Sequence, residues 1–402
     1  MADDKKHEAL KLENQPAEKY PWFWKLFGVL SILGGIDAAI AMIWGAYEFV
    51  MRDEIEVFTR DYTTVTLVIY AIAIVLAFAL AIMFFVLGVR ILRGKRQRVA
   101  LLCNIMIAIT VVIGICQFMI TGLSARLIPT AIAAALLIAL QSYSDPSLRD
   151  ERQLQFKLRQ METRTEAEEG TLGLDTTGRG YIKLNFFNLF WIFVIACVVG
   201  LVGEVIWHMV VVDPGHYQDR AGLLYGPFSP IYGVGAVLMT IALNRFHDKS
   251  FIIIFLVAAV IGGAFEFFVS WFMQTAFGIV AWDYSNQPLN ICGRTDAFFM
   301  CLWGLLGLAW VKLITPLLLK VVNLIPWNWR YVVTIVCAAF MIVDAVLTLA
   351  ALDCWYQREA GTMNYSNASA ITQFCNEHYD NDYMANRFQS MTMDPSSASR
   401  AN

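Results

Sequence analysis

The chain has 402 residues, of which 58% are hydrophobic and only 16% are charged, and its formal net charge is −3. An average soluble domain carries about 25% charged residues. The composition excludes a nucleic-acid-binding protein, because there is no excess of positive charge to contact phosphates. It also argues against a soluble catalytic domain, because the apolar residues occur in long blocks that a soluble core helix does not need.

Nine apolar blocks follow one another along the chain. They are Leu26–Tyr47, Val65–Val89, Val99–Gly122, Leu127–Tyr143, Phe187–Val211, Ile231–Leu243, Phe251–Met273, Ala297–Val321 and Val332–Leu352. About 20 apolar residues in a helix cross a hydrocarbon core of ~30 Å, and a lone strand would leave its backbone unpaired in lipid. The fourth and sixth blocks are short for a span. The sequence therefore predicts an all-α fold, a polytopic transmembrane helical bundle with about nine spans.

Lysine and arginine are concentrated in alternate connections. Five lysines precede the first block, and arginine-rich segments follow the second and fourth blocks, whereas the connections between them are poor in positive charge. Positively charged loops stay in the cytoplasm. We therefore expect a multi-pass protein of the plasma membrane with a cytoplasmic N-terminus and, with nine spans, a C-terminal tail outside. The first block is too long for a cleaved signal and is predicted to be a retained span.

A polar segment divides the chain into two membrane units. Leu148–Glu169 is rich in helix-forming charged residues and contains no proline or glycine, so we expect a charged cytoplasmic helix there. Gly170–Gly180 is typical of a flexible joint. The predicted parts are a polar cytoplasmic N-terminus (1–25), a four-span N-terminal unit (26–143), a charged cytoplasmic linker (144–184), a five-span unit (185–353) and a polar C-terminal tail (354–402).

Ionisable residues inside the predicted spans are candidate functional groups, because each costs free energy in lipid unless it is paired or hydrated. Glu204 and Glu266 lie in the outer part of their spans, and Asp344 lies somewhat closer to the middle. His208 follows Glu204 by four residues and so shares its helix face. A structural role, a ligand or ion site, and proton chemistry all remain open for these groups.

Two polar and aromatic connections flank these acids. Residues 225–233 contain two prolines and two glycines, which forbid a regular helix, and residues 282–294 are rich in polar and aromatic side chains. Irregular backbone near membrane depth is tolerated where protein covers it or where it lines a wet cavity. We therefore predict an outward-facing polar pocket, in which Arg294 is the counter-charge for Glu204, Glu266 or Asp283.

The candidate substrate- or ion-binding residues can then be named together. They are Glu204, His208, Tyr225, Tyr232, Glu266, Trp282, Asp283, Asn290, Arg294 and Asp344.

The eight cysteines contain no C-x-x-C pair. Cys292, Cys354 and Cys375 lie outside the apolar blocks, and the sequence leaves open both a disulfide between Cys354 and Cys375 and three unrelated thiols. No His/Cys spacing suits zinc, so we expect neither a metal nor a cofactor. The G-x-x-x-x-G-K-[ST], H-E-x-x-H and G-x-S-x-G motifs are absent, and the chain therefore has no phosphate loop with which to hydrolyse ATP.

The five-span unit also carries an ordered series of short motifs. These are Gly203-Glu204 with Trp207, Gly226-Pro227-Phe228-Ser229-Pro230-Ile231-Tyr232-Gly233, Glu266-Phe267, Trp271, Phe277-Gly278, Trp282-Asp283-Tyr284-Ser285, Pro288-Leu289-Asn290, Gly293-Arg294 and Trp303-Gly304-Leu305-Leu306-Gly307. From Phe187 to Leu352 the unit resembles the bacterial ABC-transporter type IV family, or CmpB-like permeases. The resemblance implies a permease of the bacterial plasma membrane, leaves room for a separate ATP-binding subunit, and supplies no substrate.

Three functional hypotheses follow. In the first, the chain is a permease subunit whose solute approaches Glu204 and Glu266 from outside. In the second, it is a membrane-embedded enzyme that uses the two acids on a lipid substrate. In the third, it is a non-catalytic sensor or assembly partner that docks through Leu148–Glu169. The lipid bilayer is the partner common to all three, and a homo-oligomer is compatible with each.

Overall fold

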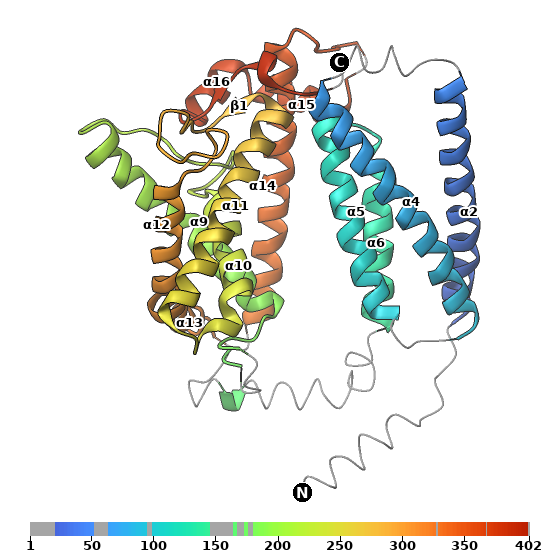
Figure 1. The fold of residues 1–402 in the computed structure, drawn as a ribbon, viewed down its shortest axis with the longest axis horizontal. Helices are drawn as coiled ribbons and strands as arrows, with labels where there is room; N and C mark the ends of the chain where they lie inside the picture. Colours follow the sequence, from blue (N-terminus) through green and yellow to red (C-terminus); the bar gives the residue numbers. More distant parts are fainter. Residues whose placement is uncertain are drawn as a thin grey trace, which may run out of the picture. The chain divides into compact units, whose positions relative to one another are not determined.

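The computed structural model describes residues 21–51, 63–94, 99–144, 164–166, 173–175, 180–326, 329–366 and 368–400. These residues are mostly helical and contain almost no strand, and the all-α prediction is confirmed (Figure 1). The chain forms two compact units, a first unit within Met1–Leu154 and a second within Gln155–Arg400. The N-terminal residues 1–20 and most of the predicted linker helix Leu148–Glu169 lie outside the described residues.

Seven helical segments of the described chain are long and apolar enough to cross a membrane. They are α2 (Trp22–Met51), α4 (Thr64–Leu92), α5 (Val99–Thr121), α9 (Phe186–Trp207) with the π-helical η1 (His208–Val212), α11 (Phe251–Phe277), α12 (Ala297–Ala309) with the π-helical η3 (Trp310–Ile314) and α13 (Thr315–Val322), and α14 (Arg330–Glu359). Two shorter apolar helices, α6 (Leu127–Ser144) and α10 (Pro230–Leu243), correspond to the fourth and sixth predicted spans. Nine was therefore slightly more than the number of full-length spans.

The first unit is a helical bundle with an apolar core. Buried Leu87, Ile91, Met106 and Leu137 belong to one cluster of its helices. Helices α2 and α4 approach closely because glycines lie in their contact: a Cβ on Gly88 would meet an α2 carbonyl oxygen at 2.4 Å. Small residues allow such close approach of membrane helices.

The second unit packs α9–α14 around a second apolar core. Its buried cluster includes Ile192, Met239, Ile254 and Trp310 from four different segments. Glycines again form the contacts, because a Cβ on Gly262 would meet the Trp303 ring at 2.2 Å. The aromatic side chain of one helix therefore fills the space that the glycine of its neighbour leaves.

The C-terminal tail folds back onto one end of the second unit, which we call the capped end. It is the end at which α11 and α14 end and α12 begins; the opposite end, where residues 180–185 enter α9, is the linker end. The tail contributes α15 (Ala370–His378), α16 (Asn381–Arg387), β2 (Thr392–Met393) and η4 (Pro395–Ser397). Figure 1 shows α15, α16 and β1 (Ile279–Val280) at the same end of this unit.

A small antiparallel pairing fixes the tail to the end of α11. Ile279 pairs with Met393, and Val280 pairs with Thr392. Gly278 ends α11 with φ of 64°, and a Cβ there would meet the Asp394 carbonyl oxygen at 2.1 Å. Only glycine fits a left-handed C-cap with the backbone of another segment this close.

Candidate functional site

Glu204 lies in the last turn of α9, close to the capped end. Arg220, in the connection between η1 and α10, donates from Nη1 to Glu204 Oε1 at 3.3 Å. The side chain of Tyr232, at the start of α10, also hydrogen-bonds to Glu204. Its ring packs directly over Gly200, where any Cβ would clash with it. Glu204 therefore has one cationic partner and one phenolic partner.

Arg294 is not the counter-charge, and that prediction was wrong. Its Nη1 donates to Ser270 Oγ at 3.2 Å and its Nη2 donates to Gln274 Oε1 at 2.6 Å. Both partners lie on α11 one turn and two turns beyond Glu266, and burial of the guanidinium lowers the pKa of Arg294. The Arg294 side chain therefore bonds to two polar residues near the end of α11, whereas the side chain of the next residue, Thr295, bonds to Glu266.

Sequence reasoning missed Arg220 as the partner of Glu204. The signal was available, because Arg220 is the single lysine or arginine in the connection 213–229. A lone positive charge beside a carboxylate in a span is a natural pair. The motif around Arg294 drew attention to the other connection instead.

Glu266 is buried in α11, with 8% of its surface exposed. The hydroxyl of Tyr284 donates to Oε1 at 3.0 Å, and the hydroxyl of Thr295 donates to Oε2 at 2.8 Å. Trp303 of α12 is a third side-chain hydrogen-bond partner. These three partners are neutral, so the carboxylate is solvated by protein dipoles and not by a cation.

Tyr284 connects the two acids. Its pKa is raised, first by burial and then by the charges of Glu266, Asp296 and Glu204, so the phenol keeps its proton and remains a donor. Tyr284 also acts electrostatically on Tyr232. We call the group Glu204, Arg220, Tyr232, Glu266, Tyr284 and Thr295 the polar cluster. It draws its members from α9, α10, α11 and the two connections at the capped end.

Asp344 accepts a hydrogen bond from the backbone of the connection before α10. Its Oδ1 accepts from the Tyr225 amide at 3.2 Å, and one turn later Thr348 Oγ1 accepts from the Leu224 amide at 3.0 Å. Asp344 lies halfway along the 30-residue helix α14. The connection 213–229 is therefore a re-entrant segment that reaches the middle of the bundle, where side chains satisfy its amides.

The tail holds this re-entrant segment in place. Arg387 of α16 donates to the carbonyl oxygens of Leu223 at 2.9 Å and Gly226 at 2.7 Å, and to Asp219 Oδ2 at 2.8 Å. The hydroxyls of Tyr225 and Tyr379 are 2.6 Å apart. Three hydrogen bonds from one guanidinium give a rigid attachment that a lysine could not reproduce.

The remaining candidates shape the connections or lie buried at their edge. Trp282 donates to the Arg294 carbonyl at 2.9 Å, and Asn290 donates to the Gln287 carbonyl at 2.8 Å. Asp283 accepts from the Ser285 hydroxyl and amide, which lowers the pKa of this exposed carboxyl. His208 is 7% exposed, and its Nδ1 has no protein partner.

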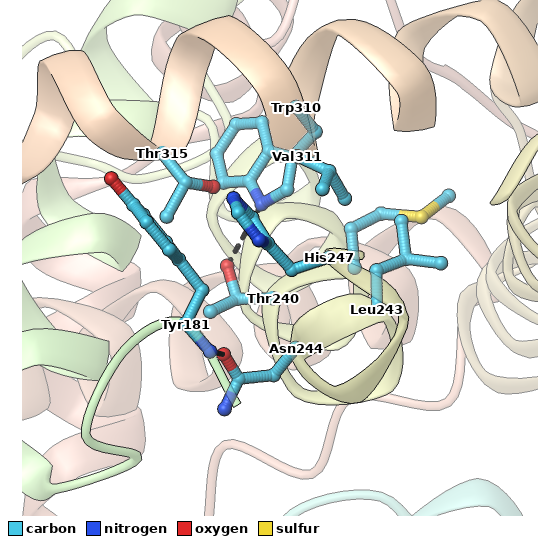
Figure 2. Close-up of a pocket in the computed structure, with 9 residues that line it drawn as sticks. Tyr181, Thr240, Leu243, Asn244, His247, Trp310, Val311 and Thr315 are labelled. Carbon is cyan, nitrogen blue, oxygen red and sulfur yellow. Dashed lines mark hydrogen bonds between the residues drawn. The ribbon is translucent and has the colours of Figure 1, made fainter. Parts of the chain in front are cut away.

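A small pocket at the linker end was not predicted from the sequence (Figure 2). Tyr181 stacks on His247 with ring centroids 4.3 Å apart, and Asn244 accepts from the Tyr181 amide at 2.9 Å. Trp310 donates to Thr240 Oγ1 at 2.9 Å along the wall. The cavity of about 10 Å³ has room for one water molecule and not for a larger solute.

Helices of this length, together with a re-entrant segment and acids at membrane depth, define a multi-pass α-helical membrane protein. Residues 191–349 match the family model described as "Putative ABC-transporter type IV". The C-terminal part of the chain, about two-fifths of its length, therefore carries the sequence of this family, as its motifs predicted. No curated protein and no solved structure matches the chain.

Proposed function

We propose that the second unit is a membrane permease for a small cationic or polar solute, in a conformation closed at the capped end. The observation that carries the proposal is the re-entrant segment 213–229, which reaches Asp344 at mid-bundle beside the polar cluster. Half-buried loops at membrane depth are typical of proteins that pass polar solutes. The family match of residues 191–349 supports the same class.

The charges of the polar cluster favour a cation. Glu204 has Arg220 as its partner, but Glu266 is held by the neutral side chains of Tyr284, Thr295 and Trp303. A carboxylate buried in a span without a cation favours a positively charged ligand, or a proton, as its compensation. His208 Nδ1 and Arg220 Nε add two buried polar atoms without protein partners.

The capped end acts as the gate in this proposal. Arg387 attaches the re-entrant segment to the tail, and in this proposal that segment closes the solute's path from the capped end to the polar cluster. Opening the path would break these hydrogen bonds and swing the segment 213–229 away from Asp344. The tail therefore sets how easily the permease opens.

The orientation and the partner belong to the same proposal. A cytoplasmic N-terminus places the capped end outside and the linker end inside the cell. A separate ATP-binding subunit would then meet the linker end, where Arg245 and Lys249 are exposed. If several copies assemble, they would contact one another through the lipid-facing sides of their apolar helices.

Flux in reconstituted vesicles tests the proposal. The purified chain would be assayed with radiolabelled sodium, rubidium, choline, spermidine and, as a neutral solute, mannitol. We expect flux of one of the cations above that of empty vesicles. Glu204→Gln and Glu266→Gln should each lower it by at least about 10-fold, since an interaction worth 1.4 kcal/mol is a factor of ten.

The matched control is Glu377→Gln, which changes an exposed glutamate of α15 in the same unit. It should leave flux unchanged. Two results would contradict the proposal. One is the same flux in Glu204→Gln, Glu266→Gln and Glu377→Gln, and the other is flux of every tested solute that equals that of empty vesicles.

A further inference from the structure

Two cysteines lie side by side where the tail meets α14. Cys354, in the last turns of α14, is 2% exposed, and Cys375, in α15, is fully buried. Their side chains form a hydrogen bond with each other. The Sγ of Cys354 also lies 4.0 Å from the Thr372 carbonyl, one turn before Cys375 in α15. Helix packing therefore brings together two thiols that are twenty-one residues apart in sequence.

An arginine fixes the geometry around this pair. Arg358 of α14 donates to Asn381 Oδ1 and Asn376 Oδ1, each at 2.6 Å, and to the Tyr379 carbonyl at 2.8 Å. These partners lie in α15, in α16 and between them. The thiols consequently stay in register, and a cross-link between them would close residues 354–375 into a loop.

The two thiols are chemically unequal. The pKa of Cys375 is lowered, first by the hydrogen bond from Cys354 and also by the positive charge of Arg358. Cys375 is therefore the more acidic thiol of the pair and loses its proton more readily than Cys354. Thiolate character makes a cysteine the attacking group in disulfide exchange.

We propose that Cys354 and Cys375 are joined by a disulfide in the mature protein, which fastens the tail to α14 at the capped end. The oxidant is a protein disulfide of the compartment that this end faces. The Cys375 thiolate attacks one sulfur of that disulfide and forms a mixed disulfide, and the Cys354 thiolate then displaces the oxidant's cysteine. The two thiol protons and the two electrons pass to the oxidant, which leaves as a dithiol.

The cross-link fits the predicted orientation, because disulfides persist outside the cytoplasm. It would keep α15 and α16 against α14 when the permease opens, so that Arg387 can re-form its hydrogen bonds to the re-entrant segment on closing. The proposal does not depend on transport, since the thiols meet whatever the second unit carries.

Cleavage between the two cysteines tests it. A specific protease site is inserted after Met363, and a tag is placed at the C-terminus of the full chain, which is purified in the presence of N-ethylmaleimide. After cleavage the two fragments should run together on a denaturing gel without reductant and separate with it. The fragments of the Cys354→Ser and Cys375→Ser variants should separate even without reductant. The fragments of Cys337→Ser, which changes another cysteine of α14, should stay linked.

Thiol counting on the unchanged chain provides an independent readout. Denatured protein should take up two fewer N-ethylmaleimide groups without reductant than with it, by mass spectrometry. Uptake of the same number in both conditions, or fragments of the parent chain that separate without reductant, overturns the proposal. Neither outcome bears on flux, so failure here is distinguishable from failure of the permease proposal.

Discussion

The two units have similar hydropathy and use their polar residues differently. In the first unit the buried cluster is apolar, and hydroxyls such as those of Ser31 and Thr110 bond to the carbonyl four residues before them in their own helix. In the second unit, carboxylates at membrane depth bond across helices and connections. The contrast teaches that apolar length defines a span, whereas carboxylates that bond across helices and connections mark a candidate site.

The largest expected effect is on the buried ion pair between Arg400 and Asp353, whose side chains are each 5% exposed. Arg400→Ala should destabilise the second unit by about 3–5 kcal/mol, because Asp353 is left as a buried charge. Unfolding in detergent measures the loss. Arg245→Ala, at an exposed arginine of the linker end, is the control, and equal stability of the two variants would show that the tail is not anchored there.

Arg387→Ala should lower the free energy of unfolding by somewhat less, about 2–3 kcal/mol. The variant loses three hydrogen bonds, but the side chain of Arg387 is already 20% exposed. Arg387→Lys keeps the charge but not the geometry and should fall between the parent and Arg387→Ala. Hydrogen exchange of residues 218–226 measures the release of the re-entrant segment. Unchanged protection in both variants would contradict the proposed gate.

One substitution in each unit sharpens the comparison. Gly88→Ala and Gly262→Ala both insert a methyl group into a tight helix contact, and each should cost about 1–3 kcal/mol. Gly262→Ala also pushes against Trp303, a hydrogen-bond partner of Glu266. Both variants should unfold more easily, but only Gly262→Ala should lower flux. A fall in flux with Gly88→Ala would mean that the first unit shares in transport.

Two hydroxyls give a smaller and cleaner version of that test. Thr130 donates to Gln117 Oε1 at 2.7 Å in the first unit, and Thr295 donates to Glu266 Oε2 at 2.8 Å in the second. Either threonine replaced by valine should cost about 0.6 kcal/mol, the usual value for such bonds in membranes. Thr295→Val should change flux, and Thr130→Val should serve as its control.

The smallest effect is expected on the stability of the turn at Asp283. The pKa of this exposed carboxyl lies below its ordinary value of 3.8, because the Ser285 hydroxyl and amide donate to it. A depressed pKa stabilises the turn above the ordinary value, and this contribution is lost as the pH falls through the folded pKa. A nuclear magnetic resonance titration should place the midpoint below 3.8. Ser285→Ala should move it upwards, and no movement would exclude the hydroxyl as the cause.

The apolar spans could be predicted because hydropathy depends on local sequence alone. The short helix α10 shows where that reasoning fails, because it begins only at Pro230, where the re-entrant segment already lies against the middle of α9. The depth that this segment reaches depends on Asp344, which is more than a hundred residues away in sequence. No local pattern encodes such a contact.

The acids of the site were identifiable, but their partners were not. Glu204 and Glu266 stand out as charges in apolar runs, whereas the choice between Arg220 and Arg294 depends on how each connection turns. The tail was predicted only to be polar, because its helices are too short for a clear periodicity. Its role came from Arg387 and Arg400, which bond to segments more than a hundred residues before them.

The most direct test of the account is whether water-borne reagents reach the polar cluster. Thr295→Cys, at a position that is 1% exposed, would be made with Cys292 and Cys301 replaced by serine and treated with a membrane-impermeant methanethiosulfonate. The account predicts reaction within minutes from the side of the capped end, as the re-entrant segment opens. Complete protection of the folded protein, with full reaction after unfolding, would contradict it.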